Sequence, residues 1–399
     1  MDEVISNETL WDFGTFVNQS NEKKAVSPNG GAVGLLETKT TNFGSFVYLK
    51  SYTPRMSEMN KYFPSNRFGQ IRVFTVSAAV LAVWAMSLCG EARGVQKGSG
   101  TPPLAVSKTT NPEGWMVTQG DRLFAGYRFD SNGKPIIYPL VGPGGHRMTR
   151  DFPMKDAGPS ERNDHDHHRS FWLTHGDVNG IDFWLDDDHC GKIVHRSGKA
   201  VTLDDGSVVI TTENDWNAPD GKRLLSDVRR YHFHVAKGRR IIDADFLLIA
   251  SDGDVNFGDT KEGSFGLRVA GTMKVDAKGG GLVTNAEGLN NKQAWGKKSA
   301  WVNYSGPVSG EMVGVTVHDH PESFQYPCRW HVRTYGLFAA NPFGVYHFEG
   351  GEKTKGVVLE EGKQMRLSYR VILETGELDS AKTQKDSKDY ASSPRPKLN

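Results

Sequence analysis

The sequence predicts an all-β protein built around one large antiparallel β-sandwich. Many short apolar runs are separated by turn-forming residues, and glycine is abundant, with 45 copies among 399 residues. Several runs alternate apolar and polar residues, which is typical of strands with one buried face. No amphipathic helix of ordinary length stands out. Many strands joined by tight turns favour a sandwich or barrel, and about 280 residues suits a double sheet larger than an immunoglobulin-like domain.

The first 94 residues are expected to lie outside this sandwich. The single long apolar run, Val73 to Leu88, follows arginines and precedes small residues, which is the order of a secretory signal. The run has about 16 residues, fewer than the roughly 20 that span a bilayer. A start at Met59 gives a signal peptide over residues 59–94 and a secreted or periplasmic protein, so we interpret residues 1–58 as a misassigned or disordered extension. A cytoplasmic tail before a single N-terminal membrane anchor is the alternative.

The rest of the chain divides into three parts. Residues 95–112 are expected to form a linker, and residues 113–378 are expected to form the β-sandwich domain. Residues 379–399 are rich in Lys, Ser and Pro and are expected to form a disordered tail. The formal net charge is +1, and charged residues of both signs are scattered along the chain. No basic stripe is present, which argues against a nucleic-acid partner. Cys190 and Cys328 lie about 140 residues apart, a spacing that permits a disulfide in an exported protein but gives no disulfide framework.

Individual strands are predicted from alternation and from the turns between them. Asn132-Gly133 lies between two apolar runs, 123–129 and 136–140, and predicts a hairpin. In the run 229–235, Tyr231 and Phe233 point to one side, and the turn at Gly238 leads into a strand over 241–249. Further strands are expected at residues 208–210, 265–273, 312–318, 344–347, 357–360 and 365–373.

Residues 145–184 hold the densest set of groups that can carry chemistry. Five of the chain's 13 histidines fall there, among arginines, aspartates and aromatic residues. Imidazoles, carboxylates and aromatic rings together suit acid–base catalysis, metal ligation or sugar recognition. The chain lacks a phosphate-binding GKS or GKT loop, a GxSxG elbow, an HExxH motif and a dinucleotide fingerprint. The sequence therefore predicts a polar site but leaves its reaction open.

The run Asn163 to Ser170 is the centre of this region. If it is extended, side chains alternate between two sides. His165, His167 and Arg169 then share one side, and Asp164, Asp166 and His168 share the other. Two imidazoles at positions i and i+2 can ligate one metal, whereas a histidine held by an aspartate, here His168, can act as a general acid or base. A solvated loop of hydrogen-bonded histidines is the plainer alternative.

Three further segments are candidates for the same site. Residues 172–184 combine glycines with aromatic rings that suit a sugar face, although such rings are equally often core. Residues 258–268 offer Glu262 as the carboxylate partner of a histidine and Arg268 as a ligand for an anionic or hydroxylated group. Residues 317–324 carry a second i, i+2 pair, His318 and His320.

Four blocks of the sequence resemble a family of unknown function from planctomycetes and related bacteria, often labelled "methane oxygenase PmoA". They are RDFPMKDAGPSERNDHDHHRSFWLTHGDVNGIDFW, KEGSFGLRVAG, AWVNYSG and HDHPESFQYPCRWHVRTYGLFAANPFG, within residues 115–374. A methane monooxygenase membrane subunit needs several spanning helices, and this chain has at most one candidate. The family is similar to galactose-mutarotase-like β-sandwiches, in which a histidine and a glutamate act at the sugar C1; by analogy this implies those roles for His175 and Glu262.

Together these features predict an exported carbohydrate-active protein, interpreted as an enzyme that uses histidine and carboxylate acid–base chemistry for epimerisation, elimination or hydrolysis. The expected acid–base residues are His167, His168, His175 and Glu262. The residues expected to bind the saccharide are His146, Arg147, Arg150, Asp164, Arg169, Trp172, Asp177, Arg268, His318 and His320. No stable membrane span is expected after signal cleavage.

Two other classes stay open. One is a metal-dependent hydrolase or oxygenase, in which His165, His167 and His318 or His320 ligate a divalent metal, the only cofactor that the histidine pairs suggest. The other is a non-catalytic glycan-binding or structural module of the periplasm, with the same residues satisfied by hydrogen bonds.

Overall fold

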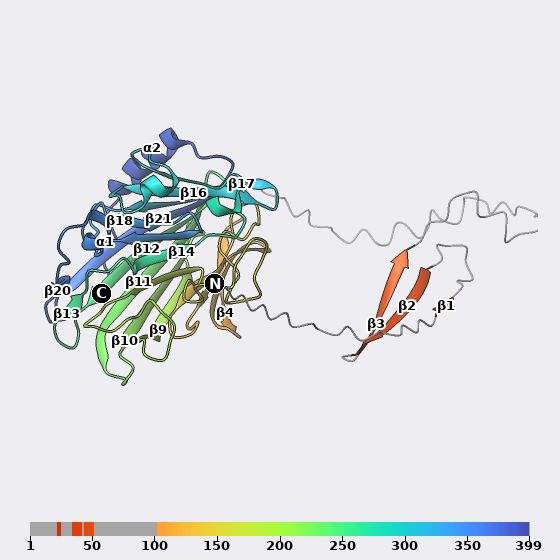
Figure 1. Cartoon of the computed structure of the whole chain (residues 1–399), viewed down its shortest axis with the longest axis horizontal. Helices are drawn as coiled ribbons and strands as arrows, with labels where there is room; N and C mark the ends of the chain where they lie inside the picture. The colour runs from red at the N-terminus through yellow and green to blue at the C-terminus, as the bar shows by residue number, and fades with distance from the viewer. Residues whose placement is uncertain (1–21, 25–33, 42–43, 52–101, 399) are drawn as a thin grey trace, which may run out of the picture. The chain divides into compact units, whose positions relative to one another are not determined.

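The computed structural model describes residues 22–24, 34–41, 44–51 and 102–398 (Figure 1). The chain forms two compact units, Met1–Gln96 and Lys97–Asn399. The first contains an antiparallel sheet of β1 (Glu22–Lys24), β2 (Gly34–Thr41) and β3 (Gly44–Ser51). These strands lie within residues 1–58, which were interpreted as a misassigned or disordered extension; β2 and β3 contain several β-branched and aromatic residues, which favour strands. The apolar run 73–88 and the predicted signal peptide lie outside the described residues.

The second unit contains two antiparallel sheets of eight strands each, which confirms the predicted all-β sandwich (Figure 1). The first sheet has the order β18-β19-β14-β8-β7-β6-β5-β4. Its strands are β4 (Leu104–Thr110), β5 (Glu113–Gln119), β6 (Arg122–Arg128), β7 (Ile136–Leu140), β8 (Phe171–His175), β14 (Gly263–Arg268), β18 (Arg329–Val332) and β19 (Leu337–Asn341).

The second sheet has the order β15-β16-β17-β21-β12-β11-β10-β9. Its strands are β9 (Lys192–Thr202), β10 (Val208–Asn217), β11 (Arg223–Ala236), β12 (Arg239–Ile249), β15 (Leu282–Asn285), β16 (Trp301–Val308), β17 (Glu311–Asp319) and β21 (Gln364–Thr375). A small pair, β13 (Val255–Phe257) and β20 (Val357–Leu359), and two helices, α1 (Val345–Glu349) and α2 (Ser380–Ala391), complete the unit.

The core forms where alternating residues of both sheets meet. Tyr231 and Phe233 of β11 belong to one buried cluster with Leu173 of β8 and Phe265 of β14. The intervening residues of β11, β12 and β21 face away from this cluster and are largely polar, as His232, Asp243 and Ser368 illustrate. The predicted hairpin is also present, because β6 pairs with β7 across Asn132 and Gly133, both of which have positive φ.

Two predicted boundaries and one predicted strand are wrong. Residues 104–110, expected within a linker, form β4, which pairs along its length with β5 and buries Leu104. The tail expected to be disordered contains α2, because Asp379 caps its N-terminus and Tyr390 is buried. Of the strand expected at 344–347, residues 345–347 belong to α1 instead; a short apolar run has too little periodicity to distinguish a strand from a helix.

Three further observations bear on the predictions. Cys190 and Cys328 are both buried and free, so the structure does not pair them. The aromatic residues Phe171, Trp172, Phe183 and Trp184 are all buried, which favours their interpretation as core. Within residues 102–398 and the short N-terminal strands, no helix is long and apolar enough to cross a membrane.

Candidate functional site

A cleft of about 370 Å³ is lined by residues of β18 and of the loops next to β8 and β14. Three segments that are distant in sequence contribute to it: the connections on either side of β8, the residues just before β14, and β18 with the turn that follows it. The lining residues are His165, His167, His168, Asp182, Leu185, Lys261, Glu262, His331, Arg333 and Tyr335. The predicted His-rich run and the predicted Glu262 segment therefore do meet.

The three neighbouring histidines gather on one side of the loop instead of alternating. Their ring centroids are separated by 5.7 Å for His165 and His167, 5.0 Å for His165 and His168, and 4.4 Å for His167 and His168. The run is not a strand, and His165 has a φ of 49°, which reverses the local chain direction. The expectation of two opposite faces was wrong because it assumed extended backbone.

Arg150 holds this loop from inside the protein. Its guanidinium is almost fully buried and donates hydrogen bonds to the backbone oxygens of Asp164 at 2.8 Å and His165 at 2.6 Å. It also donates to the Asp164 carboxylate at 3.1 Å, and Arg268 contacts the same oxygen at 3.3 Å. Burial would raise the pKa of Asp164, but Arg268 and the other neighbouring cations lower it overall. Arg150 and Arg268 therefore shape the histidine loop.

His168 is paired with an arginine and not with the predicted aspartate. Its Nδ1 lies 2.9 Å from Nη1 of Arg268, and its ring stacks on Trp172 with the centroids 5.5 Å apart. Because a guanidinium can only donate, Nδ1 accepts, and the proton of the neutral ring is on Nε2. Burial and the neighbouring His167 and Arg268 hold the pKa of His168 well below its usual range. His168 is therefore a neutral hydrogen-bond donor at physiological pH.

His167 and Glu262 are the partly exposed acid–base candidates of the cleft. Burial, followed by the charge of Lys134, lowers the pKa of His167 to about 4, and the carboxylates of Asp186 and, less strongly, Glu262 oppose this lowering. Glu262 is 29% exposed and forms an ion pair with Lys261. Burial also raises the pKa of Asp182, which Glu262 raises further. The cleft therefore combines a free-base imidazole with two carboxyl groups.

His331 is a cleft residue to which the sequence analysis assigned no role. Its Nδ1 lies 2.9 Å from the backbone oxygen of Lys261, so Nδ1 donates and Nε2 carries the lone pair of the neutral ring. Burial lowers the pKa of His331 to about 4, with Glu262 as the strongest opposing influence. Arg333 and Tyr335 come from the turn after β18, and Tyr335 stacks on His165. The only available signal was their place within a block that resembles the family.

His175 lies outside the cleft, on the core side of β8. It is 1% exposed, and its ring approaches Phe343 with the centroids 4.7 Å apart. Nε2 donates to the backbone oxygen of Gly258 at 2.9 Å, and Nδ1 lies 3.3 Å from Oγ of Ser264. His175 alternates with Trp172 and Thr174, so it points to the opposite side of the strand. Both nitrogens are occupied, and the geometry gives no support to an acid–base role by analogy.

Other predicted binding residues also lie away from the cleft lining. His146 pairs with Glu311 at 2.9 Å, and Arg147 pairs with Asp151 at 2.6 Å, beside a separate hollow of about 300 Å³. Arg169 contacts Asp186 at 2.6 Å. Asp177 accepts from the backbone N–H of Gly180, as in a turn, and Trp172 is buried beneath His168.

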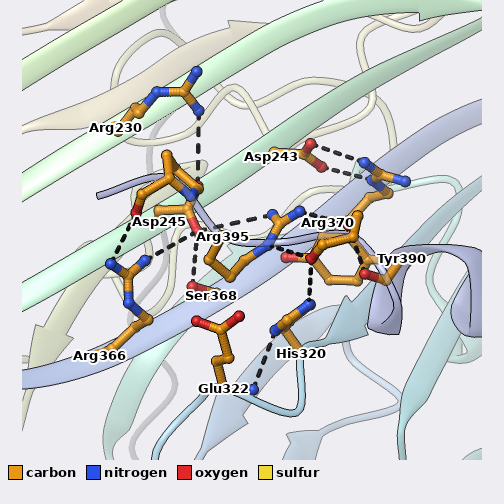
Figure 2. Close-up of polar contacts among 12 residues, drawn as sticks. Arg230, Asp243, Asp245, His320, Glu322, Arg366, Ser368, Arg370, Tyr390 and Arg395 are labelled. Atoms are coloured by element: carbon orange, nitrogen blue, oxygen red, sulfur yellow. Dashed lines mark hydrogen bonds and ion pairs between the residues drawn. The ribbon is translucent and has the colours of Figure 1, made fainter. Parts of the chain in front are cut away.

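His318 and His320 belong to the second sheet and its C-terminal cover. His320 donates from Nε2 to the backbone oxygen of Ser393 at 3.0 Å, and its ring faces Tyr390 of α2 (Figure 2). The His318 ring lies 6.5 Å from the Tyr390 ring, centroid to centroid. Among the described residues, the ligand atoms of His165, His167 and His318 or His320 do not form a group lying within 4.8 Å of one another. The structure therefore does not assemble the metal set that the i, i+2 pairs suggested.

Comparison with known proteins gives distant structural likenesses and one family. Solved structures with a similar fold include the galactosidase domain of the α-galactosidase–sucrose kinase AgaSK (11% identity, 68% of this chain, 42% of that chain, TM-score 0.35). Another is the GH36 α-galactosidase AgaB from Geobacillus stearothermophilus (11% identity, 68% of this chain, 41% of that chain, TM-score 0.36). A third is a glycoside hydrolase family 97 enzyme in complex with acarbose from Pseudoalteromonas sp. strain K8 (10% identity, 69% of this chain, 34% of that chain, TM-score 0.29).

The chain corresponds to less than half the length of each of these structures. The search of curated proteins found no match. A family model described as "Family of unknown function (DUF6807)" matches residues 115–388, which is more than half of the chain and includes every residue that lines the cleft. The protein is therefore a member of the DUF6807 family.

Proposed function

We propose that the cleft binds a saccharide and that His167 and Glu262 act on it as an acid–base pair. The observation that carries this proposal is the convergence of a free-base imidazole and a carboxylate on one cleft of about 370 Å³. That volume falls within the roughly 300–1,000 Å³ of small-ligand sites. A neutral imidazole accepts a proton at physiological pH, and a nearby carboxylate stabilises the cation that forms.

The other cleft residues suit a ligand that is rich in hydroxyl groups. Each hydroxyl both donates and accepts, so a sugar needs donors and acceptors from the protein. His168 offers Nε2–H as a donor, His331 offers the Nε2 lone pair as an acceptor, and Arg333 offers further donors. Epimerisation, elimination and hydrolysis all require such proton transfer. We also propose that the protein is exported, on the basis of the signal-like order of residues 59–94.

A panel of saccharides, assayed for both binding and product formation, tests the proposal. His167→Asn and Glu262→Gln remove the proton-transfer groups and keep much of the side-chain size. We expect each to reduce turnover by about 10²–10⁴-fold, the usual contribution of a positioned acid or base. His189→Asn is the matched control, because His189 is an exposed histidine that does not line the cleft. Turnover that is equal in all four proteins contradicts the acid–base assignment.

The pH dependence of turnover gives a second test. His167 acts as a base only when its ring is unprotonated, and its pKa is lowered to about 4. We therefore expect activity to fall as the pH drops through about 4 and to show no step near 6.5, the value of an unperturbed histidine. Saturable binding without product over the whole pH range favours instead the glycan-binding module.

A further inference from the structure

A second cluster of potential ligands lies on the outer face of the second sheet. Tyr231 and Phe233 of β11 enter the core, so His232 and His234 take the opposite face. Asp243 of β12 is the register partner of His232. Each of these three residues places one possible ligand atom within 4.8 Å of those of the other two. In the described segments, no other group of three His, Cys, Asp or Glu side chains meets this distance.

One imidazole of this cluster lacks a partner. Nε2 of His234 is buried without a hydrogen bond, 3.9 Å from Oδ2 of Asp243. The two histidine rings stack with their centroids 5.0 Å apart, and Nε2 of His232 contacts Oγ of Ser207 at 2.8 Å. A buried nitrogen without a hydrogen-bond partner is unfavourable, so a group that bonds to it is favoured.

The charges around the cluster permit a cation. Arg370 donates to both oxygens of Asp243, at 2.6 and 2.8 Å, and so fixes the orientation of the carboxylate. Each carboxylate oxygen has a second lone pair that remains available. Arg370 and Arg230 both disfavour a positive charge here, whereas the Asp205 carboxylate, in the turn before β10, acts on both imidazoles as a further negative charge and offsets part of this repulsion.

We propose that His232, His234 and Asp243 bind a divalent transition-metal ion, for which Zn²⁺ is the probe, with water as the remaining ligand. Nitrogen and carboxylate ligands lie about 2.0–2.2 Å from zinc, which separates tetrahedral ligand atoms by roughly 3.4 Å. The 3.9 Å between His234 and Asp243 therefore needs to shorten by only about 0.5 Å, a small side-chain rotation. The site is independent of the cleft, since its residues come from the other sheet.

The first experiment measures zinc retained by the full chain after loading and exhaustive dialysis. We expect about one ion per chain in the wild type and at least a tenfold weaker affinity in His232→Asn and in His234→Asn. His167→Asn reports on the cleft and His189→Asn on exposed histidines, and both are expected to retain the ion. A wild type that retains no zinc, or His232 and His234 variants that retain it fully, overturns the proposal.

A second experiment needs no substitution and so does not depend on the variants folding. Diethyl pyrocarbonate modifies accessible unprotonated histidines, and mass spectrometry locates the products. We expect Zn²⁺ to reduce modification of His232 and His234 at least several-fold and to leave His189 unchanged. Equal modification of His232 and His234 with and without Zn²⁺ overturns the proposal.

Discussion

The cleft and the C-terminal network use the same residue types in opposite ways. We define the C-terminal network as Asp245, Arg366, Arg370, Tyr390 and Arg395, which meet where the segment 379–398 packs on the second sheet (Figure 2). There, Asp245 is fully buried, accepts from Ser368 at 2.7 Å and lies within 3.8 Å of three arginines. In the cleft, His167 and Glu262 line open volume. Polar groups that a covering segment seals hold the fold together, whereas those left open are available to a ligand.

Substitution of Tyr390 is expected to have the largest effect on stability in the C-terminal network. It is fully buried, and the guanidinium groups of Arg370 and Arg395 lie 4.6 and 4.5 Å from its ring centroid. Tyr390→Ala removes this packing and leaves a cavity beneath α2. We expect the free energy of unfolding to fall by about 3–5 kcal/mol, the usual cost for a large buried aromatic residue. Denaturant unfolding measures the change.

The control for Tyr390 is on the same helix. Lys385 pairs with Asp389 on the exposed side of α2, and such surface pairs contribute about 0.3–0.5 kcal/mol. Lys385→Ala is therefore expected to leave the unfolding midpoint nearly unchanged. Equal midpoints for wild type and Tyr390→Ala contradict the conclusion that the segment 379–398 is part of the folded unit.

Asp245 is expected to give the next largest effect. Asp245→Ala leaves Arg230, Arg366 and Arg395 without their shared carboxylate, and removing one partner of buried ions costs about 3 kcal/mol. Burial raises the pKa of Asp245 despite these neighbours, so its negative charge is only partly compensated. Asp245→Asn, which keeps the shape and an oxygen for Ser368, is therefore expected to cost less than Asp245→Ala. Thermal unfolding of both variants measures the difference, and the reverse order contradicts the account.

The buried His318 is expected to make the stability of the fold depend on pH. It is fully buried, both ring nitrogens lack a hydrogen bond, and burial lowers its pKa to about 3. The unfolded chain, with a histidine pKa near 6.5, therefore binds more protons than the folded chain below pH 6.5. The stability that this group contributes is fully present above about pH 6.5 and is lost as the pH falls towards 3, by at most about 1.4 kcal/mol per pH unit.

The His318→Leu variant isolates this contribution. Leucine cannot be protonated, so the difference in unfolding free energy between wild type and variant is expected to shift in favour of the variant as the pH falls from 6.5 to 3. Taking the difference removes the contribution of other groups, such as Asp319, whose pKa burial raises to about 7. A difference that is constant over this range contradicts the lowered pKa.

The fold was largely predictable because alternation is a local property of the chain. In β21, Met365, Leu367, Tyr369, Val371 and Leu373 are buried as their period of two predicted. Predictions failed where tertiary contacts decide the structure. Helix α2 has a polar sequence, and its buried Tyr390 and the Arg239–Asp386 ion pair at 2.5 Å exist only once the second sheet has formed.

The candidate site was predictable in part for the same reason. The density of histidines predicted the loop 163–170, and Glu262 was predicted as a carboxylate partner of a histidine; residues of both segments line the same cleft. The positive φ of His165 was not evident from the sequence, so the arrangement of the imidazoles was wrong. His331 and Tyr335 reach the cleft only through the order β18-β19-β14-β8, which no local pattern specifies. His175 was misplaced because its side of β8 depends on strand register.

The smallest effects on stability are expected in the cleft, and they complete the comparison. In the described part of the chain, the His167 ring makes no hydrogen bond, and Glu262 pairs only with Lys261, whose side chain is 41% exposed. His167→Asn and Glu262→Gln are therefore expected to change the free energy of unfolding by less than about 1 kcal/mol, as is usual for partly exposed polar groups. Thermal unfolding of these variants beside Tyr390→Ala measures the difference in stability between the two regions.

If either cleft substitution destabilised the protein as much as Tyr390→Ala does, these groups would be part of the structural framework, and a loss of turnover could no longer be assigned to chemistry. A small change in stability with a large loss of turnover separates the two regions by role.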